Sequence, residues 1–353
     1  MSQLNRMMAN ERGAFLKERQ PEGALAPRKA GTSVMQLANI DDDQPAFAQK
    51  IAILLCTYHG QHFLADQLDS FAAQTYPNWE VWASDDGSLD DTHAILEAYQ
   101  QKWGQQRLSM HTGPAQGFAA NFLSLSCDAD IVADYYAYSD QDDIWEADKL
   151  QRAVEWLRTV PADTPALYCS RALLVDIDNQ PIGMSPLFTR APNFANSLIQ
   201  SIGGGNTMVF NDAARVLLRK AGKDVNIVSH DCWAYMVVSG CGGKIFYDAA
   251  PGVRYRQHEG NLVGTNISWQ ARWSRGTRLW NGWFRSWNDR NIESLQRLYG
   301  SLTPENKRIL DDFCKARQTW LLPRLWLMAR CGVRRQSTAG NLALFVAAIF
   351  NKI

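Results

Sequence analysis

The stretch "YAYSDQDDIW", from Tyr136 to Trp145, decides how the fold is interpreted. A run typical of a buried strand ends here, and Asp140, Asp142 and Asp143 follow it within four positions. Clustered carboxylates beside apolar sequence cost free energy unless each charge has a partner. What these three acids hold is therefore the first question that the sequence raises.

Composition limits the classes of protein that the chain can belong to. The 353 residues are 46% hydrophobic and carry 36 basic and 36 acidic side chains, so the formal net charge is zero. That length can bury one large α/β domain, or a domain with an appended region. A neutral balance argues against a nucleic-acid partner, which would require a basic excess.

The cysteines and the hydropathy pattern indicate where in the cell the protein is located. Seven cysteines are scattered without a C-x-x-C pair, which argues against a zinc ribbon and favours a reduced, cytoplasmic protein. No apolar segment is typical of a secretory signal, and none reaches the ~18 residues of a membrane span. We therefore expect a cytoplasmic protein.

Three regions differ in composition. Residues 1–49 mix charges, prolines and glycines, which predicts a disordered extension. Residues 50–265 carry the regular patterns of a catalytic domain. Residues 266–353 are rich in Trp and Arg and are predicted to be mostly helical.

Strand and helix patterns alternate four times between residues 51 and 157. This alternation predicts an α/β fold with a Rossmann-like, mostly parallel sheet and helices on both faces. The later part is less regular, with a strand predicted over 166–176, a helix over 231–238 and an extended segment over 252–257. The first strands are expected at 51–56, 79–83, 108–111 and 135–139, and the helices at 62–74, after Asp90 or Asp91, at 117–125 and at 147–157.

Three polar motifs follow predicted strands. They are Cys56-Thr57-Tyr58, the segment 84–88 and the segment 140–143. Because ligands of open α/β sheets bind outside the carboxyl ends of the strands, these motifs should meet in one crevice. Carboxylates without His or Cys neighbours suit Mg²⁺ or Mn²⁺, which usually bind one or two carboxylates together with substrate phosphates. The alternative is that the acids only cap the following helix and are otherwise solvated.

From Ile51 to about His258 the chain resembles a family-2 glycosyltransferase with the GT-A fold. Such enzymes transfer a sugar, with inversion, from a nucleotide-sugar donor to an acceptor hydroxyl. Two of the motifs, "SDQDDIW" and "YRQH", particularly resemble the bacterial rhamnosyltransferase-like branch that builds surface polysaccharides. The resemblance thus implies a dTDP-linked rhamnose donor first and a UDP-linked hexose second. The motifs appear in the order "ILLCTYHG", "QTYPNWEVWASDDGSLDDT", "GFAANF", "YSDQDDIWEADKL", "GGGNTMVFN", "SHDCWAYMV" and "YRQH".

The resemblance implies roles for the residues that bind the nucleotide. Thr57 and Tyr58 would border the base, and Asp86, with Asp85 beside it, would hydrogen-bond the base edge. Gly117 and Asn121 share one face of a predicted helix whose start could point toward the ribose or the phosphates. The glycine run that ends at Gly205 would approach the donor sugar and the acceptor, and a plain turn is the alternative.

The resemblance also implies a metal site and a base. Asp142 would ligate Mn²⁺ or Mg²⁺ on the diphosphate, with Asp140 and Asp143 close by. His258 is a further candidate ligand or a phosphate donor, against the alternative of a packed or surface histidine. Arg254 and Arg256 face either the diphosphate or solvent.

Asp231, in "HD", occupies the place of the general base. An inverting transfer needs one group to take the proton of the attacking hydroxyl, and a carboxylate can do so. Because Asp231 starts a predicted helix, its alternative role is an N-cap, and both roles are compatible. The preceding position is often Glu in the family, so His230 departs from that pattern and its role stays open.

The C-terminal region offers a possible contact with a membrane. Trp269, Trp273, Trp280, Trp283 and Trp287 fall on one helical face, with arginines between them. One interpretation is a helix packed on the catalytic domain. The other is a helix at the inner face of the plasma membrane, where Trp and Arg suit the lipid interface, and the final "NLALFVAAIFNKI" is too short to span but long enough to lie on a bilayer.

The sequence leaves the acceptor and two rival functions open. Acceptors of the resembling family are saccharides and are often lipid-linked. One rival function is a sugar-phosphate nucleotidyltransferase, but "CTYHGQHF" lacks the glycine-rich basic loop that such an enzyme needs. The other is a non-catalytic sugar-binding or scaffold protein, against which the intact acids argue.

Overall fold

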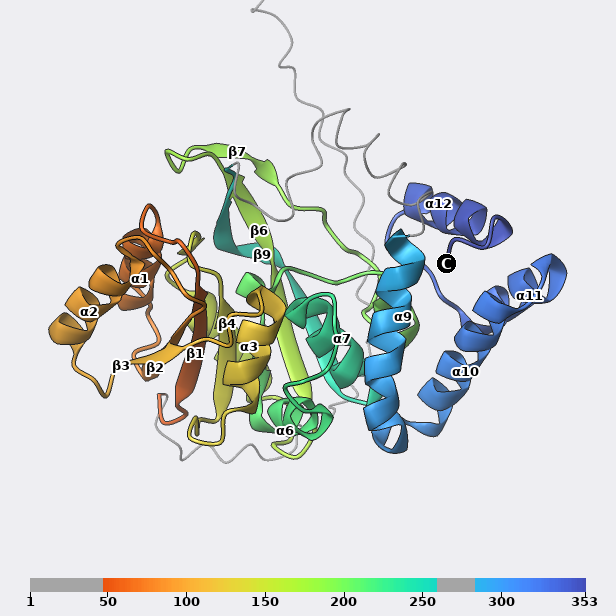
Figure 1. Cartoon of the computed structure of the whole chain (residues 1–353), viewed down its shortest axis with the longest axis horizontal. Helices are drawn as coiled ribbons and strands as arrows, with labels where there is room; N and C mark the ends of the chain where they lie inside the picture. Colours follow the sequence, from red (N-terminus) through yellow and green to blue (C-terminus); the bar gives the residue numbers. More distant parts are fainter. Residues whose placement is uncertain (1–46, 259–282) are drawn as a thin grey trace, which may run out of the picture. The chain divides into compact units, whose positions relative to one another are not determined.

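A computed structural model of the chain describes residues 47–258 and 283–353 (Figure 1). Its strands form one mixed sheet in the order β3-β2-β1-β4-β8-β6-β9-β5, and β7 pairs with β6 outside this path. The strands are β1 Ile51–Thr57, β2 Trp79–Asp85, β3 Leu108–Thr112, β4 Tyr135–Ser139, β5 Ile144–Trp145, β6 Ala166–Val175, β7 Pro181–Met184, β8 Val209–Asn211 and β9 Lys244–Arg256.

The sheet is parallel where the sequence pattern is regular. The pairs β3-β2, β2-β1 and β1-β4 are parallel, as predicted. Beyond β4 the sheet becomes mixed, because the three-residue β8 runs antiparallel to both β4 and β6. The predicted α/β class with its helical C-terminal region is confirmed.

Helices cover both faces of the sheet (Figure 1). Side chains of β1 alternate between the faces, so Ile53 packs toward α1, α2 and α4, whereas Leu54 packs toward α3, α6 and α7. The helices are α1 Leu64–Ala72, α2 Thr92–Trp103, α3 Phe118–Cys127, α4 Lys149–Leu157, α5 Phe194–Ser197, α6 Asp212–Ala221, α7 His230–Gly240, α9 Trp283–Leu295, α10 Pro304–Gln318, α11 Leu321–Cys331 and α12 Thr338–Ile349, with 3₁₀ turns η1 Gly205–Thr207 and η2 Gln296–Ser301.

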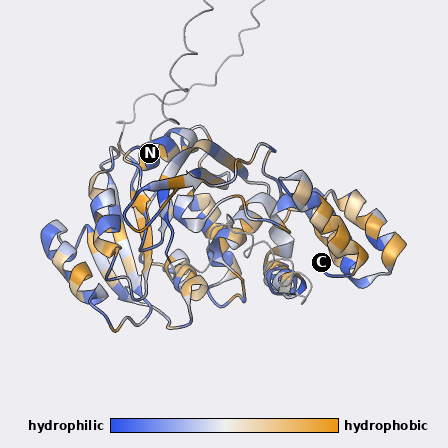
Figure 2. Cartoon of the chain, turned by 90° about the horizontal axis from the view of Figure 1, so that it is seen from above, coloured by the Kyte–Doolittle hydropathy of each residue, from blue (hydrophilic) through white to orange (hydrophobic). Residues whose placement is uncertain are grey.

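The C-terminal helices continue the core on the α7 side. Leu310 and Phe313 of α10 are buried in the same cluster as α7, and Asn306 donates hydrogen bonds to the carbonyls of Ser239 and Gly240 at the end of α7. Among the described residues, no helix combines the length and apolar character needed to cross a membrane. Orange apolar colour marks both the sheet and much of the helices beside the C-terminus (Figure 2).

The end of the predicted N-terminal extension packs on the catalytic domain. Phe47 packs on Tyr76, and Tyr76 Oη donates to the Gln49 carbonyl, so the end of the predicted extension contacts the domain. Most of the extension lies outside the described residues, as do the boundary at residue 265 and Trp269, Trp273 and Trp280. In α9, Trp287 is buried against Phe284, as the packed interpretation expects.

One buried cation ties α6 to α3 and to the sheet. Arg215 of α6 donates to the carbonyls of Ser126 and Asp128 at the end of α3 and to Tyr136 Oη of β4. We expect Arg215→Met to lower the free energy of unfolding by about 2–4 kcal/mol, because these buried acceptors lose a charged donor. Urea denaturation measures this. Arg219→Met, exposed on the same helix, is the control and should stay within ~0.5 kcal/mol of wild type.

Candidate active site

Three loops meet at the carboxyl ends of β1, β2 and β4, as predicted. Thr57 pairs with Asp85 across the β1-β2 ladder, and Thr57 Oγ1 donates to Asp85 Oδ1 at 2.8 Å. Gln141 accepts from the Tyr58 amide at 2.7 Å and donates to the Tyr58 carbonyl at 2.8 Å, so it fixes the loop after β1. Sequence reasoning missed Gln141, although it lies inside the motif between the predicted metal ligands.

The Asp85 carboxylate is hydrogen-bonded to the turn that it begins. Its oxygens accept from Ser88 Oγ at 2.6 Å and from the amides of Ser88 and Gly87, besides Thr57. Burial alone would raise the pKa of Asp85, but these hydrogen bonds together hold it below its usual value. The carboxylate therefore builds the loop, and its predicted part in binding the base stays a prediction.

Asp86 holds the loop that precedes α3. Its two oxygens accept from the amides of Ala115 at 2.7 Å and Gly117 at 2.8 Å. Both donors sit in left-handed backbone, with φ of 53° and 89°. Each carboxylate oxygen keeps a second lone pair, so a contact to a base edge is chemically open. Tyr58 is 56% exposed, which suits a side chain predicted to border a base.

The side chain of Asn121 forms hydrogen bonds inside the protein. It is buried, its side-chain oxygen accepts from Ser84 Oγ at 2.6 Å, and its amide nitrogen donates to the Ser84 carbonyl at 2.9 Å. These bonds fasten α3 to the end of β2. The geometry thus gives Asn121 a positioning role, and its predicted contact with the nucleotide is untested.

The three acids of the opening motif point in different directions. Asp143 is fully buried and accepts from the Arg256 amide at 3.0 Å and from Asn206 Nδ2. Burial, followed by the charges of Asp142 and Asp140, raises the pKa of Asp143 well above its usual value. Asp143 therefore anchors β9 and η1 and faces the protein interior, which gives no support to its predicted place beside the metal.

Asp142 and His258 form a partly exposed pair beside the buried Asp143. His258 Nε2 lies 2.8 Å from Asp142 Oδ2, although 116 residues separate them in sequence. Within the described ranges, no group of three or more His, Cys, Asp or Glu side chains is arranged to hold a metal ion. Two neighbouring ligands of an octahedral Mg²⁺ lie ~2.9 Å apart, so this pair fits a site that phosphate oxygens complete.

Asp140 is near enough to both Asp142 and Asp231 for their charges to act on it. Burial, then the charges of Asp142 and Asp231, raises the pKa of Asp140 to about 7, while Lys149 acts in the opposite direction. Lys149 is fully buried, and its Nζ donates to the Asn206 carbonyl at 2.7 Å over the Trp145 ring. The pKa of Lys149 is held well below its usual value by burial, which Asp143 and Asp140 partly oppose.

Arg254 and Arg256 both have protein partners. Arg256 is buried and donates to the Asp142 carbonyl at 3.1 Å and to Asp66 at 2.8 Å, whereas Arg254 pairs with Glu146 at 3.0 Å. Arg256 is therefore not on a solvated strand face, and it supports the backbone of the acid loop.

Asp231 lies in the first turn of α7 rather than at its N-cap. Ser229 occupies the N-cap position, and the Asp231 carboxylate accepts from Ser201 Oγ at 3.1 Å. The predicted N-cap role is therefore wrong, because the helix begins one residue before Asp231. The carboxylate is partly exposed and close enough to Asp140 to affect its pKa, as a base in the same crevice should be.

His230 and Gly205 pack against each other. The His230 ring is 4% exposed and stacks on Phe122 with centroids 3.7 Å apart, and neither ring nitrogen has a hydrogen-bond partner in the described part of the chain. A Cβ on Gly205 would overlap that ring, so glycine is required for this contact rather than for a turn. The glycine's predicted approach to a ligand is untested. Burial lowers the pKa of His230 to about 4, and the nearby Asp231 opposes this only in part.

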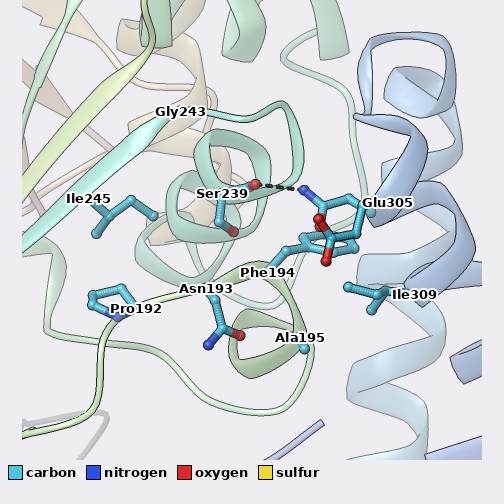
Figure 3. A pocket seen from close by; sticks show the side chains of 10 residues that line it. Pro192, Asn193, Phe194, Ala195, Ser239, Gly243, Ile245, Glu305 and Ile309 are labelled. Carbon is cyan, nitrogen blue, oxygen red and sulfur yellow. Dashed lines mark hydrogen bonds between the residues drawn. The ribbon is translucent and has the colours of Figure 1, made fainter. Parts of the chain in front are cut away.

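A pocket lies away from these predicted site residues. A pocket of about 390 Å³ is bordered by α5, the end of α7, β9 and α10, and the Ser239 carbonyl in its wall accepts from Asn306 (Figure 3). Ser239 lies eight residues after Asp231 on α7, which corresponds to about 12 Å along the helix axis. The pocket is therefore separate from the predicted chemistry.

The buried His230 should make stability depend on pH. Its pKa is about 4 in the folded chain and ~6.5 unfolded, so its contribution is complete above pH 6.5 and is lost as the pH falls toward 4. Wild type should lose about 3 kcal/mol more than His230→Gln between pH 7 and 4 in urea titrations. His93→Gln, exposed on α2, should follow wild type. Equal pH slopes for wild type and His230→Gln would contradict this account.

Comparisons with known proteins bear on the identity of this site. The family described as Glycosyl transferase family 2 matches residues 52–225. The chain is 29% identical over 242 residues to the dTDP-rhamnosyl transferase RfbG of Shigella flexneri, covering 65% of this chain and 81% of that protein. It is 28% identical over 108 residues to the UDP-Glc:alpha-D-GlcNAc-diphosphoundecaprenol beta-1,3-glucosyltransferase WfgD of Escherichia coli, covering 30% of this chain and 40% of that one.

Solved structures give weaker likenesses. The crystal structure of S. aureus TarS 1–349 in complex with UDP-GlcNAc has a TM-score of 0.47 at 14% identity and covers 80% of this chain and 90% of that one. From the sequence matches, residues 52–225 are similar to glycosyl transferase family 2, and the protein is a glycosyltransferase.

Proposed function

We propose that the protein is an inverting, divalent-metal-dependent glycosyltransferase that takes its sugar from a nucleotide-diphosphate donor. The observation that carries the proposal is the meeting of Asp142 with His258, beside Asp140, in one crevice with Asp231. The carboxylates of Asp142 and Asp140 would repel a diphosphate without a cation, whereas a shared Mn²⁺ or Mg²⁺ favours its binding.

The residues of the crevice divide into two functions. Asp142 and His258 would hold the metal, with Asp140 behind them, and the bound metal would stabilise the charge that develops on the departing diphosphate. Asp231 would accept the proton of the acceptor hydroxyl as its oxygen bonds to the anomeric carbon and the bond from that carbon to the diphosphate breaks. Ser201, which donates to Asp231, keeps the carboxylate in position.

The donor and the acceptor are proposed from the relatives. A dTDP-linked rhamnose is the first choice, because the most extensive match described above is to a dTDP-rhamnosyl transferase, and a UDP-linked hexose is the second. The acceptor would be a saccharide or a lipid-linked saccharide of bacterial surface polysaccharide synthesis. A lipid-linked acceptor implies a cytoplasmic enzyme in peripheral contact with the inner face of the plasma membrane. The family match sets aside the nucleotidyltransferase alternative.

Substituting the proposed metal ligand and substituting the proposed base should have different effects on donor binding and transfer. Asp142→Asn removes a charge from the metal pair, so donor binding should lose its dependence on Mn²⁺ and transfer should collapse. Asp231→Asn leaves the donor site intact, so donor and metal should bind nearly as in wild type while transfer falls by ~10² to 10⁴-fold. Calorimetry of donor with Mn²⁺, paired with transfer rates, measures both effects.

Asp130→Asn, an exposed acid in the loop after α3, is the control for these variants and should match wild type in both assays. Near-normal transfer by Asp231→Asn to a good acceptor would show that the base lies elsewhere. Metal-dependent donor binding by Asp142→Asn would show that this acid holds something other than the metal on the diphosphate. A wild-type protein that binds the donor but neither transfers nor hydrolyses it would favour the non-catalytic alternative.

The nucleotide should be a pyrimidine diphosphate. Tyr58 and Asp86 lie at neighbouring strand ends, where Asp86 is also fixed by two amides and can accept from a base edge. At a hundredfold excess over Kd, thymidine or uridine diphosphate with Mn²⁺ should stabilise the protein by ~2.7 kcal/mol in thermal or urea unfolding. Guanosine diphosphate should have little effect, and equal stabilisation by it would exclude this assignment.

A further inference from the structure

Helices α11 and α12 leave large apolar side chains in water. We define the α11–α12 apolar surface by six residues of these helices and their ends, each more than half exposed: Trp320 65%, Leu322 64%, Trp326 59%, Leu342 66%, Phe345 52% and Phe350 54%. Scattered exposed apolar residues are normal on a protein, but a concentration of this size on two neighbouring helices marks an interaction site.

Helix α12 is apolar on opposite sides. Leu344, Ala347 and Ala348 are buried against the protein, whereas Leu342 and Phe345 face outward one turn apart. The helix Thr338–Ile349 contains no charged residue. A helix that is apolar all round is normally covered on both sides, so the outward face of α12 lacks its natural environment in water.

The two helices form one rigid support for this surface. Arg324 of α11 is buried and donates to the Ala348 carbonyl of α12 at 2.9 Å and to the Ala316 carbonyl of α10 at 3.2 Å. Met328 of α11 and Leu344 of α12 belong to the cluster that continues into the catalytic domain. The surface is therefore joined to the catalytic domain by packed side chains.

The charge around the surface identifies the kind of partner. Between Phe313 and Ile353 the sequence has no Asp or Glu and seven basic residues, of which Arg317 and Arg330 pair with acids of other segments and Arg324 is buried. A second copy of the chain would bring the same positive charge and be repelled, whereas anionic lipid headgroups would be attracted. Trp and Arg together also suit the headgroup region of a bilayer. The seven basic residues are Lys315, Arg317, Arg324, Arg330, Arg334, Arg335 and Lys352.

We infer that the α11–α12 apolar surface docks on the interface of an anionic lipid bilayer. Helix α12 has 12 residues and is therefore about 18 Å long, too short for a ~30 Å hydrocarbon core, so it would lie along the surface. The sequence had already indicated the segment of α12 as able to lie on a bilayer, and the structure adds α11 to it. In the other candidate helix that the sequence indicated, Trp287 is buried.

The inference rests on the proposed function only in that a lipid-linked acceptor would bring the enzyme to a membrane. Its test needs neither donor nor acceptor, so a failure here would leave the transferase proposal intact. Conversely, loss of transferase activity in the Asp142 or Asp231 variants would not affect vesicle binding.

Vesicle co-sedimentation of the full chain tests the inference. We expect binding to phosphatidylcholine vesicles that contain phosphatidylglycerol, weaker binding without the anionic lipid, and partial release at high salt. The double variant Trp326→Ala with Phe345→Ala should bind at least about tenfold more weakly, because two buried aromatic contacts are lost. The matched control is Val132→Ala with Val216→Ala, two exposed apolar residues elsewhere, which should bind like wild type.

A second measurement begins with the wild-type protein, so its main result does not depend on how well the variants fold. Brominated lipid should quench part of the tryptophan fluorescence of wild type, and Trp326→Phe should reduce that quenching. The inference is overturned if anionic vesicles neither sediment nor quench the wild-type protein. It is also overturned if sedimentation velocity shows that the double variant converts a dimer to a monomer while vesicle binding is absent, because the surface would then be covered by a second copy.

Discussion

The carboxylate of Asp143 is the constraint on which the active site depends. It is fully buried, and it joins the loop after β4 to the backbone of β9 through Arg256 and to η1 through Asn206. A buried acid is tolerated only when its oxygens have partners, and both do here. The buried amine of Lys149 donates to the carbonyl of the same Asn206 and so adds a second hydrogen bond to this junction.

This anchor explains why the neighbouring acids are available for chemistry. With Asp143 turned inward, Asp142 is turned outward at the end of the loop, where His258 meets it from the end of β9. Arg256 holds the same loop through the Asp142 carbonyl and leaves the Asp142 side chain facing the crevice. In the proposed mechanism, the motif therefore divides its charges between a structural acid and a metal-binding acid.

The sequence predicted the first half of the fold well, because the strands of a parallel sheet are buried on both faces and appear as continuous apolar runs. β1 and β4 were found for this reason, and the polar motifs after them meet as expected. The inward direction of Asp143 could not be predicted, since its partners lie 63 and 113 residues later in the chain. The antiparallel pairing of β8 was not predicted either, because a run of three residues carries no signal for its direction.

The start of helix α7 and the contacts of its first residues were predicted less well. The sequence indicated that Asp231 begins a helix, but the helix begins at His230, and a boundary error of one residue changed a cap into a side chain within the first turn. The pairing of His230 with Gly205 was hidden because it joins two distant segments through shape rather than charge. Gln141 could have been noticed, since an amide between acids can bind a backbone without adding charge.

The central claim is that Asp142 and His258 hold the metal of the diphosphate while Asp143 does not. Anomalous diffraction at the manganese edge, from crystals grown with thymidine diphosphate and Mn²⁺, tests this most directly. The account predicts one peak within bonding distance of the Asp142 carboxylate and His258 Nε2, with the Asp143 hydrogen bonds to Arg256 and Asn206 unchanged. A bound nucleotide with no peak at Asp142, or a peak coordinated by Asp143, would contradict it.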